Sequence, residues 1–412
     1  MKSKTLGASL IFTGNCVGAG ILALPLSTAG LGFVATSIII TLCWLVSMLA
    51  SLLIVEVLAA YPKKELNFDS MYLLTLGRGG QIIGMLAYVI LLYSVAAAYM
   101  SGGASILTAL LSQGGIKLPS WIAAVLFTLV LGGIVYRGHR AVDISNRLLL
   151  STKGVSFIIL AALLMPDVRA SNLFDISHSM PYLWFAIPIL FFSFGLQIMV
   201  PSMFSYLDRD TREIRKAIVI GSLVPLVIYL LWLVVMLGIL PRFGSSSFSS
   251  FLANHTPNDI GDLFVMLGHR STQHLSSTMM GLFTNVAVMT TFLSLTLALH
   301  DYMRDLCKLS KGRKGRNLSI LITYLPPLLV SLFLPSLFQS ALEYAAGLQA
   351  LLLLIIPVAM VWSVRRRQDR EGTEVLFRIP GGRGLLASLA CFGAMLVVLG
   401  FMASLNMLPV LK

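Results

Sequence analysis

Charged side chains are scarce in this sequence. Only 11% of its 412 residues are Asp, Glu, Lys or Arg, whereas 57% are hydrophobic and the mean hydropathy is +0.88. Soluble domains carry about 25% charged residues, so the composition excludes an ordinary soluble globular domain. Apolar runs long enough to cross a bilayer recur along the whole chain, and they predict an all-α polytopic membrane protein.

Groups that perform enzyme or metal chemistry are also few. The four cysteines lie in or beside apolar segments without metal-ligand spacing, so neither a disulfide framework nor a metal site is expected. The six histidines are scattered over predicted loops and span ends, with no HExxH motif, and no GxxxxGK(S/T) phosphate loop occurs. We therefore expect no enzyme, no cofactor and no ATP-driven pump. A membrane-embedded enzyme remains a remote alternative.

Apolar segments of about 20 residues predict eleven transmembrane helices. They lie near 6–30, 34–60, 81–111, 119–137, 147–166, 181–205, 217–240, 277–303, 317–334, 338–363 and 384–408. The chain is expected to form a single transmembrane domain.

The net charge of +13 is explained by the distribution of basic residues. If the N-terminus is cytoplasmic, all but five of the 30 lysines and arginines fall in cytoplasmic segments. The exceptions are Lys117, Arg169, Arg242, Arg270 and Lys412. The excess is therefore a topology signal and implies no nucleic-acid partner. Eleven spans place the C-terminus on the outer side.

The first span contains a stretch that is poorly suited to a continuous helix. Gly14, Gly18 and Gly20 fall within seven residues, and Pro25 follows. Glycine tolerates non-helical dihedrals, and proline removes a backbone donor. We predict a helix that breaks inside the membrane and leaves backbone groups facing a buried ligand. Tight helix packing through small residues is the alternative.

The sixth span repeats this pattern, with Gly195 at its centre and Pro201 six residues later. The two spans are five apart and run in opposite directions in the predicted topology. This spacing predicts an inverted five-plus-five repeat, 1–166 and 181–363, with the site at the repeat interface and 384–408 as an additional helix.

A pair of such breaks suits a free amino acid. Freed N–H groups favour a carboxylate, and freed carbonyls favour an ammonium group. Candidates at the first break are Gly18, Ala19 and Gly20 with the flanking Asn15 and Val17, and those at the second are Ser193, Phe194 and Gly195. Candidates for the ligand side chain are Tyr93, Tyr99, Gln197 and Phe283. The alternative for each aromatic residue is ordinary packing or contact with lipid.

Motifs at both breaks and along nearly the whole chain resemble the bacterial hydroxy and aromatic amino acid permeases, most closely their tyrosine-specific members. The motifs are Thr5-Leu6-Gly7, Val17-Gly18-Ala19-Gly20 with Pro25, Leu53-Ile54-Val55-Glu56-Val57, Ala97-Ala98-Tyr99-Met100-Ser101-Gly102, Asp143 to Arg147, Ser193-Phe194-Gly195, Val200-Pro201-Ser202 and Leu325-Pro326-Pro327. This family belongs to the amino acid–polyamine–organocation superfamily, which shares the fold of the sodium-coupled leucine transporter.

The resemblance implies a secondary transporter in the bacterial inner membrane that imports an aromatic amino acid with protons by alternating access. Tyrosine is the first expectation, with tryptophan or phenylalanine as alternatives. A sodium-coupled or broader neutral amino acid permease is the second choice. One departure bears on the substrate, because Leu196-Gln197 replaces the Phe-His pair usual in relatives. Glutamine hydrogen-bonds but does not titrate as histidine does. Asn15 and Cys16 also replace threonines.

Two ionisable residues are candidates for proton coupling, because buried charges in membranes are costly and usually functional. Lys153 lies in the fifth span. The resemblance implies that a lysine in this helix takes the place of the cation bound by sodium-coupled members. The alternative is that the Lys153 side chain snorkels to the membrane interface. Glu56 could carry a proton or pair with a cytoplasmic cation. Glu343 is expected to be solvated near the outer surface. Thr290, Thr291 and Ser294 are the oxygen donors for the sodium alternative.

Overall fold

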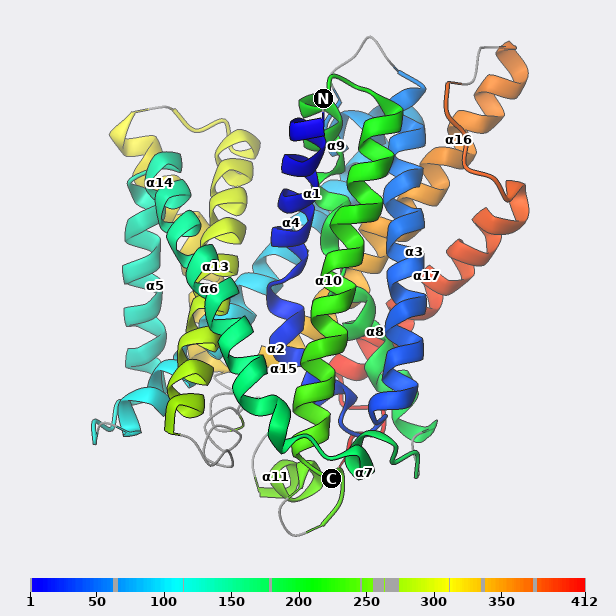
Figure 1. Ribbon diagram of the computed structural model, residues 1–412. Coiled ribbons are helices and arrows are strands. Elements are labelled where there is room, and N and C mark those ends of the chain that lie inside the picture. The colour runs from blue at the N-terminus through cyan, green and yellow to red at the C-terminus, as the bar shows by residue number, and fades with distance from the viewer. Residues whose placement is uncertain are drawn as a thin grey trace.

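The structure is a computed structural model that describes residues 2–61, 66–113, 115–177, 180–244, 247–254, 263, 274–310, 312–334, 338–372 and 376–411. All regular secondary structure within these ranges is helical, and most helices run along one common direction (Figure 1). The α-helices of the first half are α1 (Lys2–Cys16), α2 (Ala19–Thr28), α3 (Phe33–Ala59), α4 (Phe68–Gln113), α5 (Ser120–Tyr136), α6 (His139–Leu164), α7 (Ala170–Leu173), α8 (Leu183–Phe192) and α9 (Val200–Tyr206).

The second half continues with α10 (Thr211–Ile239), α11 (Phe248–Asn254), α13 (His274–Leu306), α14 (Arg313–Phe333), α15 (Phe338–Ala350), α16 (Ile356–Glu371) and α17 (Gly382–Ser404). Short 3₁₀ helices occupy η1 (Met165–Asp167), η2 (Met180–Tyr182) and η3 (Gly195–Met199). A π-helical segment, η4 (Leu351–Ile355), joins α15 to α16.

The prediction of a polytopic helical membrane protein is confirmed. Nine described helical segments are long and apolar enough to cross a bilayer. The segments Lys4–Cys16 and Gly20–Thr28 meet at 49° and make a tenth if they form one broken span. α5 is apolar but has only 17 residues. The count of eleven therefore stays a prediction.

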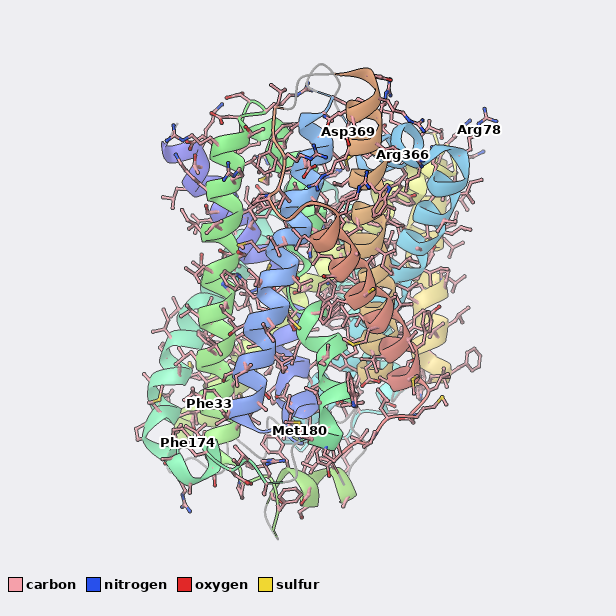
Figure 2. The ribbon with its side chains drawn as sticks, turned by 90° about the vertical axis from the view of Figure 1, so that its right-hand side faces the viewer. Phe33, Arg78, Phe174, Met180, Arg366 and Asp369 are labelled. Carbon is pink, nitrogen blue, oxygen red and sulfur yellow. The ribbon has the colours of Figure 1, made fainter. Side chains whose placement is uncertain are left out.

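The two ends of the bundle differ in chemistry. Arg78, Arg366 and Asp369 lie at one end, whereas Phe33, Phe174 and Met180 lie at the other (Figure 2). The chain termini lie at opposite ends of the bundle (Figure 1).

Burial of Glu343 differs from the expectation of a solvated side chain. This residue is only 3% exposed, because the final helix α17 packs closely along α15. The contact depends on small residues, since a Cβ atom on Gly400 would lie 2.8 Å from the Cα of Gly347 and 3.0 Å from the carbonyl oxygen of Glu343. Close backbone approach of this kind is how membrane helices commonly associate. The prediction that Glu343 is solvated is wrong.

Candidate functional site

The first break lies between the end of α1 at Cys16 and the start of α2 at Ala19. Gly18 has φ −140° and ψ −115°, which is outside the helical region, and the chain bends there. Side chains from two other helices bind the carbonyl groups that the break releases. The Tyr229 hydroxyl lies 2.6 Å from the carbonyl oxygen of Cys16, and Lys153 Nζ donates to that of Val17 at 2.6 Å. Side chains in a buried interior therefore satisfy the carbonyl groups of Cys16 and Val17.

The second break follows α8, which ends at Phe192, and precedes η3, which begins at Gly195. Its carbonyl groups also accept hydrogen bonds from side chains of other helices. Gln349 Nε2 donates to the carbonyl oxygen of Phe192 at 3.2 Å, and Asn15 Nδ2 donates to that of Gly195 at 2.9 Å. The Tyr229 hydroxyl lies 2.8 Å from the carbonyl oxygen of Ser193.

The structure thus brings the two breaks side by side. Tyr229 is within hydrogen-bonding distance of both, and its hydroxyl has one proton, so it donates to one carbonyl at a time. Gly20 sits directly against Ser193, because a Cβ atom on residue 20 would lie 2.7 Å from the Cα of Ser193. Asn15, on α1, bonds to the second break. Residues 180 positions apart in sequence therefore form one polar centre.

Lys153 connects this centre to the helices α6 and α13. Its side chain is 4% exposed, and its ammonium group also lies 3.4 Å from Thr290 Oγ1 on α13. The side chain does not snorkel to the interface, since its ammonium group contacts the first break. An ammonium group on a freed carbonyl forms a charge-assisted hydrogen bond, which is stronger than a neutral one.

Aromatic side chains surround the breaks on one side. Phe283 packs against Phe157 and Trp232 with ring centroids 5.5 and 5.2 Å away. Trp232 Nε1 donates to the carbonyl oxygen of Ile21 on α2 at 2.7 Å, so this cluster lies beside the first broken span. Phe194 meets Tyr229 edge to face at 5.3 Å. The predicted aromatic candidates at these positions thus converge on the breaks.

The two predicted tyrosine candidates, Tyr99 and Tyr93, lie in different parts of the structure. Tyr99 is fully buried in the same core as the breaks and packs against Phe338. Tyr93 belongs to a separate small apolar cluster with Leu92 and Leu299, and its hydroxyl donates to the carbonyl oxygen of Ile322 at 2.8 Å. The structure does not bring Tyr93 to the breaks.

Gln197 stands out among the polar residues near the second break. It is fully buried in η3, and neither its Oε1 nor its Nε2 has a hydrogen-bond partner in the described part of the chain. An unsatisfied buried polar group costs about 1–3 kcal/mol, so such atoms are suited to binding a polar ligand group.

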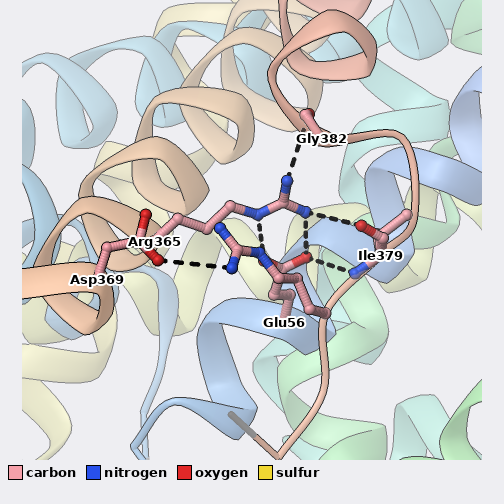
Figure 3. Close-up of polar contacts among 6 residues, drawn as sticks. Glu56, Arg365, Asp369, Ile379 and Gly382 are labelled. Atoms are coloured by element: carbon pink, nitrogen blue, oxygen red, sulfur yellow. Dashed lines mark hydrogen bonds and ion pairs between the residues drawn. The ribbon is translucent and has the colours of Figure 1, made fainter. Parts of the chain in front are cut away.

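Glu56 lies in an ion pair in the last turn of α3 (Figure 3). Arg365 Nε and Nη2 donate to its two carboxylate oxygens at 2.6 and 2.8 Å, and the backbone N–H of Ile379 donates to Oε2 at 2.9 Å. The same arginine donates to the carbonyl oxygens of Ile379 and Gly382. Both side chains are buried, and their network ties α3 to the α16–α17 connection. This arrangement matches the pairing alternative for Glu56.

Breaking this pair is expected to destabilise the protein. Arg365→Met leaves a buried carboxylate without its partner, which costs about 3–5 kcal/mol. Arg367→Met is the matched control, because Arg367 pairs with Glu371 on the exposed surface at 2.9 Å, and solvent screens an exposed pair so that it contributes little to stability. Thermal unfolding of the purified protein in detergent would compare the two variants. Equal melting temperatures would contradict a structural role for the buried pair.

A second buried arginine, Arg242, contacts the C-terminal end of α2. Arg242 follows α10 and donates from Nε to the carbonyl oxygen of Ala29 at 3.2 Å and from Nη2 to that of Gly30. Its Nη1 lies 3.5 Å from a carboxylate oxygen of Asp175. Burial lowers the pKa of Arg242, while Asp175 opposes that shift. Arg242 therefore links the C-terminal end of the first broken span to the segment after α7 and to the end of α10.

Sequence reasoning missed three residues that hold the breaks: Tyr229, Trp232 and Gln349. Each is a polar or amphipathic side chain within an otherwise apolar span. Polar groups in membrane helices usually face the protein interior, and this signal was available in the sequence. It could not say which backbone group each side chain binds.

The similarity of this chain to known proteins extends over nearly its full length. The model of the tryptophan/tyrosine permease family matches residues 1–400. Tyrosine-specific transport system 2 of Haemophilus influenzae is 31% identical, covering 100% of this chain and 99% of that protein. The tryptophan-specific transport protein of Pseudomonas aeruginosa is 32% identical, covering 99% and 97%. Glutamine transporter 2 of Aliivibrio fischeri is 28% identical, covering 97% and 99%. The similarity is therefore not confined to the two breaks.

Proposed function

We propose, because the chain belongs to the tryptophan/tyrosine permease family, that it imports an aromatic amino acid by proton symport with alternating access. Family membership makes the chain a transporter and not an enzyme. Tyrosine is the first candidate, with tryptophan or phenylalanine as alternatives. Relatives are named for tyrosine and for tryptophan, which supports an aromatic substrate. The proposed location is the bacterial inner membrane, with a cytoplasmic N-terminus.

The observation that carries this proposal is the pair of adjacent helix breaks. The first turn of α2, from Ala19, directs free backbone N–H groups toward its N-terminus, which suits the substrate carboxylate. The carbonyl groups of Ser193, Phe194 and Gly195 suit the substrate ammonium group. Asn15 and Tyr229 already bind two of them, but a carbonyl oxygen has two lone pairs and accepts a second donor.

The same geometry supports an inverted repeat. The two breaks lie in α1–α2 and α8–η3, one in each proposed half of the chain, and they meet at the centre of the bundle. Counting the bent pair and the shorter α5 as spans gives the proposed eleven, with α17 outside the repeat. The opposite positions of the termini support that count (Figure 1).

The position of Lys153 supports the proposal that it couples transport to protons. Its ammonium group binds the carbonyl of Val17 next to Thr290, a place that a sodium ion with oxygen ligands would otherwise suit. Protonated Lys153 holds the first break to α6 and α13, and loss of the proton would weaken that contact. We propose that this change couples proton release to movement of the first broken span.

Gln197 is proposed to select substrates with a polar group on the ring. A site with an unpaired amide favours a ligand that supplies the missing hydrogen bond, as a phenol or an indole does. Purified protein in nanodiscs should therefore bind labelled tyrosine or tryptophan about tenfold more tightly than phenylalanine. In Gln197→Leu this preference should fall toward one.

Phe194→Leu is the control, because it alters ring contacts without removing a hydrogen-bonding group. It should weaken binding of all three aromatic amino acids and keep their order. An unchanged preference in Gln197→Leu would refute the selecting role of the amide. If the protein bound glutamine tightly and bound no aromatic amino acid, the proposed substrate would be wrong. Glutamine, for which one relative is named, would take its place.

A further inference from the structure

A groove runs between α16 and α17 and ends at the basic end of the bundle. It consists of two adjoining cavities of about 630 Å³ each, which share Trp362, Arg366 and Arg370. One cavity continues along an apolar wall that includes Ile355, Val358 and Ala390. The other reaches the α16–α17 connection at Arg378 and Arg383. The groove therefore changes from apolar to basic along its length.

The basic part of the groove has more positive charge than its acidic residues neutralise. Asp369 pairs with Arg378 at 3.5 Å, and Glu371 pairs with Arg367. Arg366 and Arg370 form no ion pair with any residue in the described part of the chain. These two arginines are four residues apart on one face of α16, where like charges repel each other. An anion between them would remove that repulsion.

The order of residues along the end of η4 and α16 matches the depth profile of a membrane lipid. Ile355 and Val358 lie deepest, Trp362 is 46% exposed one turn further on, and Arg366 and Arg370 follow at successive turns. Tryptophan favours the membrane interface, and basic residues just beyond it face lipid headgroups. The last turns of α16 extend past the start of α17 (Figure 1), and Arg366 lies at that basic end (Figure 2).

We propose that this groove binds an anionic phospholipid. Arg366 and Arg370 hold its phosphate, since guanidinium groups bind phosphate oxygens through paired hydrogen bonds. One acyl chain lies along the apolar wall formed by Ile355, Val358 and Ala390. The charge of the arginines and the apolar wall together select a lipid over a free phosphate compound. This site is separate from the two helix breaks and does not depend on the proposed substrate.

The experiment measures lipid binding to the full-length protein in detergent by native mass spectrometry. Phosphatidylglycerol and phosphatidylcholine with identical acyl chains are the two probes, and glycerol phosphate is the soluble comparison. Phosphatidylglycerol should bind more tightly than either. R366Q/R370Q should weaken its binding about 30-fold, because each basic residue near the surface adds to the attraction of an anionic lipid.

The double variant R137Q/R140Q is the charge-matched control, because it removes two positive charges at the predicted cytoplasmic side, one just after α5 and one in the first turn of α6. It should bind phosphatidylglycerol as the unchanged protein does. Ala390→Trp should weaken lipid binding by filling the apolar wall, with no effect on glycerol phosphate. Equal loss in both double variants, equal binding of the two lipids, or glycerol phosphate binding as tightly as phosphatidylglycerol would each overturn the proposal.

Discussion

Lys153→Met is expected to abolish proton-driven accumulation of substrate while leaving part of the exchange activity. The substitution removes the ammonium group that binds the Val17 carbonyl at 2.6 Å. A hydrogen bond to a charged group contributes about 1.5–3 kcal/mol, so substrate affinity should fall about tenfold to a hundredfold. Accumulation should be lost altogether, because methionine has no proton to release. Uptake by proteoliposomes with an inward proton gradient, and exchange without a gradient, would be measured on the same preparation.

Two comparisons separate coupling from simple structural support. Thr290→Val removes the weaker contact of Lys153 at 3.4 Å but keeps the ammonium group, so it should still accumulate substrate. Lys153→Arg keeps the positive charge but does not release a proton at neutral pH, so it should exchange substrate without concentrating it. Accumulation by Lys153→Met at the level of the unchanged protein would refute a coupling role for this residue.

Gly20→Ala is expected to give the other large effect, a loss of substrate binding of about tenfold to a hundredfold. A Cβ atom at this position would lie 2.7 Å from Ser193 Cα and closer still to its side chain. A backbone atom cannot rotate away, so the two breaks must move apart. Overpacking of this kind costs about 1–3 kcal/mol, which corresponds to the expected change in affinity. Binding of labelled tyrosine to purified protein would measure it.

Gly14→Ala is the matched control on the same span. A Cβ atom on residue 14 would have its nearest neighbour, a methyl group of Leu150, at 4.0 Å, which is ordinary contact. Its binding should stay within about twofold of the unchanged protein, since surface or well-accommodated substitutions change stability little. Unaltered binding in Gly20→Ala would mean that the close approach of the two breaks is not needed for the substrate.

The helix breaks could be predicted because their cause is local. Glycines near the middle of an apolar run, with a proline downstream, disfavour a continuous helix regardless of neighbours, and both predicted breaks occur where these residues lie. The last span was placed at 384–408 and is observed at Gly382–Ser404. The third was placed at 81–111, whereas α4 begins at Phe68, because a further helical segment precedes a kink at Gly77, where φ is +72°.

Partners that depend on tertiary packing could not be predicted in the same way. Sequence alone marked Glu56 as a costly buried charge, but the identity of Arg365 as its partner depends on how α16 packs against α3. Glu343 looked solvated because its distance from the span end suggests shallow depth, but α15 packs against α17, α4 and α8, and the residue is buried. The candidate Tyr93 faces α14, which the pattern of its own helix does not reveal.

The family resemblance implies that Leu196-Gln197 stands in place of a Phe-His pair, and the structure shows where these two residues lie. Leu196 and Gln197 are both fully buried, so the change affects the interior of the second break and not its surface. A buried glutamine with two unpaired atoms demands a hydrogen-bonding ligand, whereas a leucine in place of a phenylalanine removes a ring. The substrate should therefore depend more on a polar group than on ring stacking at this position.

Proton-driven uptake of an aromatic amino acid is the central claim, and one transport measurement tests it most directly. Purified protein in liposomes would be given labelled tyrosine, tryptophan, phenylalanine or leucine under an inward proton gradient, with and without sodium. The account predicts accumulation of tyrosine or tryptophan in the absence of sodium, and none when the proton gradient is collapsed. A strict sodium requirement, or folded protein that takes up none of the three aromatic amino acids, would contradict it.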